Sequence, residues 1–130
     1  MKKIKNLKES TALLVDDDTF LRNMYAAKFK AVVGKVEVVG SAEEALERLR
    51  GGLSPSLIVF DLIMPGSGGY GLLEGMRKEH LCPDAAKIAL SNQSSEVEIA
   101  RVMDFGADGH LMKAGATPSE IVEKIIAMVS

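Results

Sequence analysis

Carboxylates follow directly after apolar runs at two places in this 130-residue chain. Asp16 and Asp17 come after residues 12–15, Ala-Leu-Leu-Val, and Asp61 comes after residues 57–60, Leu-Ile-Val-Phe. Short apolar runs of this kind are typical of strands buried on both faces, as in a parallel sheet covered by helices. Ligands collect at the carboxyl ends of such strands, so acids at these ends are placed for chemistry. The alternative is that each acid only caps a turn or a helix.

Two further runs end on polar side chains, one on Ser91 and the other on Lys113. Because the carboxyl ends of parallel strands share one edge of the sheet, these residues should meet the acids. Crowded carboxylates repel each other unless a cation or a proton relieves them. A hard divalent cation such as Mg²⁺ takes oxygen ligands and keeps several waters. Asp17 and Asp61 could ligate it directly, with Asp16 reached through water.

Lys113 and Ser91 are then left to face an anion. The group that needs both a metal and an ammonium is a phosphoryl group, and Asp61, central in the sheet, is the best candidate nucleophile. The structural alternatives stay open here: Lys113 could form an ion pair with a nearby acid, and Ser91 could form a turn hydrogen bond.

The elements that must position these residues alternate regularly along the chain. Hydrophobic periodicity and turn residues predict strands at 12–15, 35–39, 57–61, 87–91 and 110–113, and helices at 19–33, 42–50, 70–80, around 97–103 and at 119–129. Asp18 should cap the first helix, and Ser41 with Glu44 should form a capping box on the second. Five β-α units with right-handed crossovers give an α/β fold, a parallel sheet with helices on both faces.

Length and composition limit the chain to one compact domain. Of its residues, 47% are hydrophobic, and the single Cys82 excludes a disulfide framework. A net charge of −2 argues against a nucleic-acid surface. Four lysines in residues 1–11 predict a solvated basic tail ahead of a domain at 12–130. They lack the apolar run of a signal peptide or membrane span, so a cytoplasmic location is expected.

Over residues 12–129 the sequence resembles the receiver domain of two-component response regulators. The resemblance rests on four motifs, and on the intervals that separate Asp61 from Ser91 and Ser91 from Lys113. The motifs are Leu14-Val15-Asp16-Asp17-Asp18, Val59-Phe60-Asp61-Leu62-Ile63-Met64-Pro65-Gly66 with Gly69 beyond, Ala89-Leu90-Ser91, and Gly106-Ala107-Asp108 leading to Lys113.

The resemblance implies a flavodoxin-like (βα)5 three-layer fold with a five-stranded parallel sheet in the order 2-1-3-4-5. It implies that Asp61 accepts a phosphoryl group from a histidine kinase or a phosphotransfer protein. Mg²⁺ would be held by Asp17, Asp61 and the Ile63 carbonyl, with Asp16 assisting. Ser91, Lys113 and Asp61 would carry out self-phosphorylation and self-dephosphorylation only, so the domain is not expected to be an enzyme.

Signalling in this family implies a switch at Ser91 and His110 and a protein target on the face of the fourth and fifth helices. Phosphorylation-dependent dimerisation is a further expectation, and no output domain is expected within this sequence. Three positions depart from the family pattern: Lys113 is followed by Ala114 and not by proline, Asn92 is bulkier than usual, and His110 replaces Tyr or Phe. Ile63 and Gln93 should flank the phosphoryl group, and Ile63 should slow its hydrolysis.

Two other readings use the same features. Haloacid-dehalogenase phosphatases also have an aspartyl nucleophile, Mg²⁺, a hydroxyl and a lysine, but they carry a late acid pair after the lysine. Here Asp104 and Asp108 precede Lys113, and only Glu120 and Glu123 follow it. The second alternative is an interaction module that uses this fold without phosphorylation, since fold alone does not fix function.

Overall fold

The computed structural model describes residues 2–92 and 95–130. Its strands form one parallel sheet in the order β2-β1-β3-β4-β5. The strands are β1 (Thr11–Val15), β2 (Lys35–Val39), β3 (Leu57–Asp61), β4 (Ala86–Ser91) and β5 (Gly109–Met112). The helices are α1 (Thr19–Lys30), α2 (Ala42–Arg50), α3 (Gly68–Lys78), α4 (Glu96–Asp104) and α5 (Pro118–Val129), with a short 3-10 helix at Leu7–Glu9.

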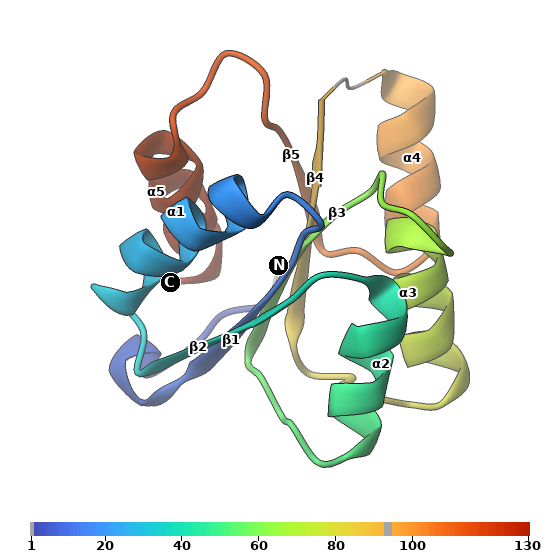
Figure 1. Cartoon of the computed structure of the whole chain (residues 1–130), viewed down its shortest axis with the longest axis horizontal. Helices are drawn as coiled ribbons and strands as arrows, with labels where there is room; N and C mark the ends of the chain where they lie inside the picture. Colours follow the sequence, from blue (N-terminus) through green and yellow to red (C-terminus); the bar gives the residue numbers. More distant parts are fainter. Residues whose placement is uncertain (1, 93–94) are drawn as a thin grey trace.

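The helices cover both faces of the sheet, so the molecule has three layers (Figure 1). Helices α1 and α5 pack on one face, where Phe29 and Ile125 are buried against Val59 of β3. Helices α2, α3 and α4 pack on the other face around Phe60 of β3. The predicted flavodoxin-like α/β fold with strand order 2-1-3-4-5 is therefore confirmed.

Strand β3 is the central element, because β1 and β4 pair with its two edges. All five of its residues are buried, which explains why its sequence is an unbroken apolar run up to Asp61. The loop after it turns back tightly onto the strand. A Cβ on Gly69 would lie 2.9 Å from the carbonyl oxygen of Asp61, so the start of α3 can approach β3 this closely only with glycine.

Several predicted helix and strand ends are wrong by one to three residues. Helix α1 ends at Lys30 and not at Val33, because residues 31–33 turn to bring the Gly34 N–H to the carbonyls of Leu7 and Ser10. Helix α3 covers Gly68–Lys78, whereas residues 70–80 were expected. Strand β5 is shifted back by one residue, and Lys113 follows it.

Helix capping follows the sequence in part. The Asp18 carboxylate accepts from the Leu21 N–H at 3.1 Å, as predicted. On α2, Ser41 accepts from the Glu44 N–H as expected, but Glu44 accepts from the N–H of Gly40 and not from that of Ser41, so the predicted capping box is incomplete. A full capping box lies on α5, formed by Thr117 and Glu120.

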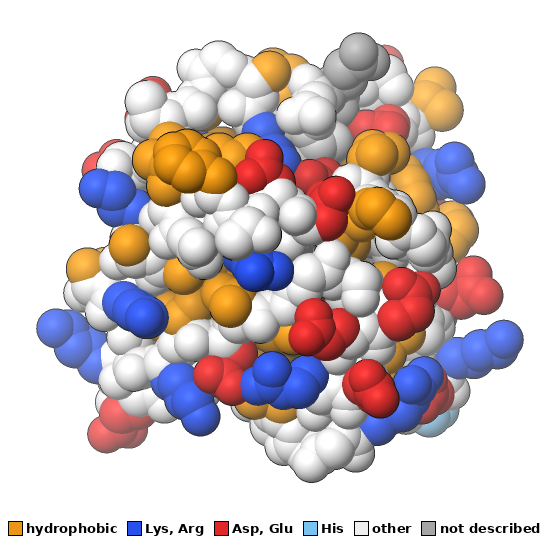
Figure 2. Space-filling model, viewed as in Figure 1, with side chains coloured by type: hydrophobic (Ala, Val, Ile, Leu, Met, Phe, Trp, Pro, Cys, Tyr) orange, Lys and Arg blue, Asp and Glu red, His pale blue; other side chains and the backbone are white. Residues whose placement is uncertain are grey.

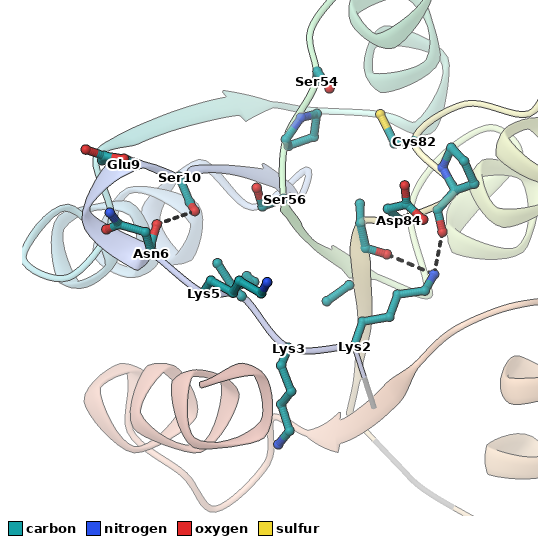
Figure 3. Close-up of a pocket in the computed structure, with 15 residues that line it drawn as sticks. Lys2, Lys3, Lys5, Asn6, Glu9, Ser10, Ser54, Ser56, Cys82 and Asp84 are labelled. Atoms are coloured by element: carbon teal, nitrogen blue, oxygen red, sulfur yellow. Dashed lines mark hydrogen bonds between the residues drawn. The ribbon is translucent and has the colours of Figure 1, made fainter.

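The basic segment at the N-terminus packs against the domain, which corrects the expectation of a solvated tail. Its Ile4 N–H donates to the Val129 carbonyl at 2.6 Å. The ammonium of Lys2 donates to the carbonyls of Pro83 and Ala85 at 2.6 and 3.2 Å (Figure 3). Lys5 remains exposed. The division of the chain between residues 11 and 12 stays a prediction.

This segment helps to enclose a pocket of about 470 Å³ that it shares with the residues just before β3 and β4, among them Ser56 and Asp84 (Figure 3). The pocket lies at the amino ends of the strands, at the opposite edge of the sheet from Asp61. Within the described ranges, no helix is long and apolar enough to cross a membrane.

Candidate functional site

Three carboxylates gather at the carboxyl ends of β1 and β3. Asp16, Asp17 and Asp61 each offer an oxygen that lies within 4.8 Å of the others. Asp16 and Asp61 are buried, with 4% and 7% of their surface exposed, whereas Asp17 is exposed. The adjacent strands β1 and β3 are paired in register, which brings their terminal acids to the same edge. The predicted acidic cluster is therefore present.

Lys113 is the counter-charge of this cluster. Its Nζ donates to Oδ2 of Asp61 at 2.7 Å and lies 3.5 Å from Oδ2 of Asp16. The lysine side chain is only 9% exposed. Burial lowers the pKa of Lys113, but the hydrogen bond to Asp61 and the nearby Asp16 carboxylate outweigh burial and raise the pKa above its usual value. The ammonium is thus charged at neutral pH.

Asp16 is held at one oxygen and lacks a hydrogen bond at the other. Its Oδ1 accepts from the Asp18 N–H at 2.9 Å, whereas its Oδ2 is buried without a hydrogen-bond partner. Burial raises the pKa of Asp16, and the Asp18 N–H and Lys113 offset this only in part. A buried carboxylate oxygen that accepts no hydrogen bond, beside two more acids, belongs to the kind of oxygen donor set that a hard cation requires. The residues present therefore fit Mg²⁺.

The loop after β3 contacts the same carboxylate. The backbone N–H of Ile63 donates to Oδ1 of Asp61 at 3.2 Å, so both oxygens of Asp61 accept a hydrogen bond. The Ile63 side chain is 70% exposed at the rim. Phe20, at the start of α1, is 71% exposed. Figure 2 shows hydrophobic and acidic side chains side by side over the end of the molecule where β1 and β3 finish.

Ser91 and His110 meet on the neighbouring strands. Ser91 Oγ lies 2.7 Å from Nε2 of His110, and the Ser91 carbonyl accepts from the Lys113 N–H at 2.7 Å. Burial lowers the pKa of His110, while Glu98 on α4 raises it to a smaller extent. The hydrogen bond between Ser91 and His110 was not foreseen in the sequence. That the two residues act together as a switch stays a prediction.

One residue near the site was missed in the sequence. Arg22 on α1 donates from Nη1 to the carbonyl oxygen of Asp16 at 3.3 Å, which ties the helix to the loop after β1. The only signal for Arg22 in the sequence is its position, one turn into the helix that follows Asp16, Asp17 and Asp18. Gln93, expected to flank the phosphoryl group, lies outside the described residues. The Lys113–Ala114 bond is trans, as no cis peptide occurs among those residues.

Known proteins are similar to this chain in sequence. Residues 12–126 match the model of the response regulator receiver domain family. The nitrate/nitrite response regulator protein NarL of Escherichia coli (strain K12) is 34% identical over 113 residues, covering 85% of this chain and 50% of NarL. The two-component response regulator ORR6 of Oryza sativa subsp. japonica is 31% identical over 115 residues, covering 87% of this chain and 67% of that protein. The chain thus spans about half the length of the curated relative NarL.

A solved structure of similar size agrees. The CheY-like response regulator receiver domain protein from Methanospirillum hungatei JF-1 superposes with a TM-score of 0.77 at 28% identity, covering 92% of this chain and 93% of that one. The family match, the strand order and the position of the acidic cluster lead to one conclusion. The chain belongs to the response regulator receiver domain family.

Proposed function

We propose that Asp61 accepts a phosphoryl group from a phosphohistidine and that the resulting acyl phosphate switches the domain between two signalling states. The donor is a histidine kinase or a histidine phosphotransfer protein, since receiver domains pair with such proteins. The observation that carries the proposal is the 2.7 Å contact between Lys113 Nζ and Asp61 Oδ2 inside a cluster of three acids. An ammonium and a carboxylate at this distance are placed to act on one anionic group.

Asp16, Asp17 and Asp61 would hold Mg²⁺, together with the Ile63 carbonyl. The metal supplies positive charge to the oxygens of the phosphoryl group and so reduces its repulsion by the acids. The Oδ2 of Asp16 supports this assignment, because it lies 3.5 Å from Lys113 Nζ but accepts no hydrogen bond. A buried carboxylate oxygen without a hydrogen-bond donor is costly unless a nearby cation or a proton compensates it.

The remaining chemistry belongs to side chains of this chain. An oxygen of Asp61 attacks phosphorus, the bond from phosphorus to the donor imidazole breaks, and the imidazole nitrogen leaves with the electron pair. Lys113 is charged and contacts Oδ2 of Asp61, which is either the attacking oxygen or the other oxygen of the same carboxylate. The ammonium therefore stabilises negative charge at this position. The Ser91 hydroxyl donates to a phosphoryl oxygen. The Ile63 N–H orients the carboxylate before the attack.

The output surface lies on α4, β5 and α5. Exposed hydrophobic residues on this side include Val97 and Met103 of α4, which are 79% and 42% exposed, and Met112 of β5, which is 46% exposed. Such side chains favour a protein partner or a second receiver over solvent. We therefore infer a downstream protein target on the α4 and α5 face, with dimerisation after phosphorylation as one form of output. A cytoplasmic location agrees with this role.

Acetyl phosphate, or beryllofluoride as a phosphoryl mimic, tests the proposal in the presence of Mg²⁺. A receiver takes up one phosphoryl group per chain at Asp61, and the Asp61→Asn variant takes up none. Steady turnover of phosphate esters would assign the chain to the phosphatases instead. A chain that stays unlabelled, and whose NMR spectrum does not change with beryllofluoride, would be an interaction module without phosphorylation.

A further inference from the structure

A second pocket lies between the end of α3, the start of β4 and the loop that joins α4 to β5. Its volume is about 210 Å³. The lining is mainly apolar and includes Met76 and Phe105, whereas its ionisable residues are Arg77, His80 and Lys87. No carboxylate of the described residues lines this pocket. An apolar cavity with a few polar groups is the usual form of a small-molecule site, and here those groups are all basic.

Lys87 brings a buried positive charge to the pocket. The residue is 7% exposed, and its ammonium donates to the backbone carbonyls of Cys82 and Ala85 at 3.0 and 3.2 Å. Asp108 accepts from the Lys87 backbone N–H at 2.9 Å, but its ion pair, at 3.5 Å, is with the ammonium of Lys2. The Lys87 ammonium therefore has carbonyl dipoles around it and no carboxylate of the described residues at ion-pair distance. A buried charge without an opposite charge beside it is costly.

A second ammonium adds to the excess of positive charge. Lys2 donates to the same Ala85 carbonyl as Lys87, also at 3.2 Å (Figure 3). Burial lowers the pKa of Lys87, Lys2 lowers it further, and Asp108 opposes this only in part. An anion in the pocket would offset the repulsion between the two ammonium groups.

Arg77 and His80 are held at the pocket by the backbone around them. Nη2 of Arg77 donates to the Asp104 carbonyl at 2.7 Å, and the guanidinium has further N–H groups that can donate to an anion. A Cβ on Gly106 would lie 3.1 Å from the same Nη2, so glycine lets this loop lie close against the guanidinium. His80 has a φ of 55°, which is uncommon for a residue other than glycine and costs energy of a kind often found at binding sites.

We propose that this pocket binds a small carboxylic acid with an apolar body, whose carboxylate lies against Lys87 and Arg77 and whose apolar part packs on Met76 and Phe105. A volume of about 210 Å³ is below the roughly 300–1,000 Å³ of pockets for drug-sized ligands, so the acid is small. Inorganic phosphate would match the charge but leave the apolar lining without contacts. The inference is independent of the proposed function, because Lys87 is near the amino end of β4 and Asp61 is at the carboxyl end of β3.

Phenylacetate is the probe, and its binding to the whole chain is followed by ¹H–¹⁵N NMR without Mg²⁺. The amide signals of Lys87 and Gly106 should shift with a Kd on the order of 1 mM. Phenylacetamide has the same shape without the charge, and acetate has the charge without the ring. Each of these, and inorganic phosphate, should bind at least about tenfold more weakly than phenylacetate. Equal affinity for phenylacetamide or for phosphate overturns the inference.

Variants locate the binding site. Lys87→Met keeps most of the side-chain length without the charge and should weaken phenylacetate binding by about tenfold. Arg77→Met should weaken it in the same direction, and this variant decides the question if Lys87→Met does not fold. Lys78→Met is the matched control, because Lys78 is exposed on the same helix as Arg77 but does not line the pocket. An unchanged Kd in the pocket variants, an equal loss in Lys78→Met, or shifts confined to other parts of the chain would overturn the inference.

Discussion

Lys113 and the two buried acids illustrate how single side chains set the properties of this site. The ammonium contacts Asp61 and lies near Asp16, yet one oxygen of Asp16 has no hydrogen bond. One buried positive charge therefore faces two buried carboxylates and cannot satisfy both. The metal-free domain is held in an arrangement that favours a bound cation and costs conformational stability without one.

Replacement of Asp16 by Asn should stabilise the metal-free protein. Because burial raises the pKa of Asp16, the charged carboxylate is less favourable in the folded than in the unfolded chain. The folded protein therefore gains most from this acid below about pH 3, where it is protonated in both states, and loses that gain as the pH rises through the unfolded and then the folded pKa. In EDTA, Asp16→Asn should raise the free energy of unfolding at neutral pH by on the order of 1 kcal/mol, with little effect near pH 3.

Urea denaturation at the two pH values measures this difference. Asp17→Asn is the matched control, since Asp17 is exposed and its charge is solvated. An equal gain in both variants would mean that net charge, and not the burial of Asp16, is responsible. Saturating Mg²⁺ should reverse the order of wild type and Asp16→Asn, because the ligand stabilises the chain that binds it more tightly.

The side chain of Ile63 should limit how fast the acyl phosphate is hydrolysed. It is 70% exposed, two residues beyond Asp61, where water must approach phosphorus in line. A branched alkyl group cannot orient that water, whereas an amide can. Ile63→Asn should shorten the lifetime of the phosphorylated protein by about tenfold, while Ile63→Val leaves it nearly unchanged. Decay of the phosphorylated band in Mg²⁺ without kinase measures the lifetime, and equal decay in Asn and Val variants would exclude water positioning at residue 63.

At the scale of helices and strands, two places where one backbone segment lies close against another hold the fold around the site. Helix α3 begins against the end of β3, where Gly69 leaves room for the Asp61 carbonyl. The N-terminal segment is tied to α5 through Ile4 and Val129. Neither contact involves a charged group of the site, yet the first fixes the loop that carries the Ile63 N–H to Asp61.

Gly69→Ala should destabilise the domain and disturb the loop after β3. The added Cβ would lie 2.9 Å from both the Asp61 carbonyl and the Leu62 Cα, and backbone atoms cannot move aside cheaply. A cost of about 1–3 kcal/mol is expected from overpacking of this kind. The control is Gly51→Ala, where the nearest atom, the Glu47 carbonyl oxygen, is 3.4 Å away. Similar unfolding free energies for the two variants in urea would show that the β3–α3 approach is not tight.

Sequence periodicity predicted every regular strand and helix of the sheet layers, because each strand is a short apolar run and each helix has an apolar stripe. The same pattern predicted that Asp61 and Lys113 lie close together, because both lie at the carboxyl ends of strands of one parallel sheet. The helix ends were less predictable: α1 stops at Lys30 because Gly34 bonds to residues far from the helix. The Ser91–His110 hydrogen bond depends on the register of β4 and β5, which periodicity does not define.

The molecule as a whole places its chemistry at one edge of the sheet and a basic pocket at the other. The acids, Lys113 and Ser91 lie at the carboxyl ends of the strands. Lys2 and its neighbours close the amino ends (Figure 3). The N-terminal segment therefore contributes to the stability of the domain and not to the site. Its effect on phosphorylation should be small even though its contacts are numerous.

A chain that begins at Leu7 should be less stable by about 1–3 kcal/mol and still take up phosphoryl groups. It loses the Ile4–Val129 hydrogen bond, the packing of Ile4 on the α1–α5 core, and the Lys2 contacts with the residues before β4. Thermal unfolding and the initial rate with acetyl phosphate measure the two properties. Lys5→Ala is the control for lost charge, because Lys5 is exposed. A truncated chain as stable as wild type would mean that the segment does not pack on the domain in solution.

The most direct test of the central claim is to locate the phosphoryl group itself. Borohydride converts an acyl phosphate to an alcohol, so a phosphorylated Asp61 becomes homoserine, which tandem mass spectrometry identifies by mass and position. After incubation with acetyl phosphate and Mg²⁺, we expect homoserine at residue 61 in wild type and a strongly reduced yield in Lys113→Ala, which lacks the ammonium that contacts Asp61. Conversion at Asp16 or Asp17 in place of Asp61, or no conversion in a chain that binds Mg²⁺, would contradict the account.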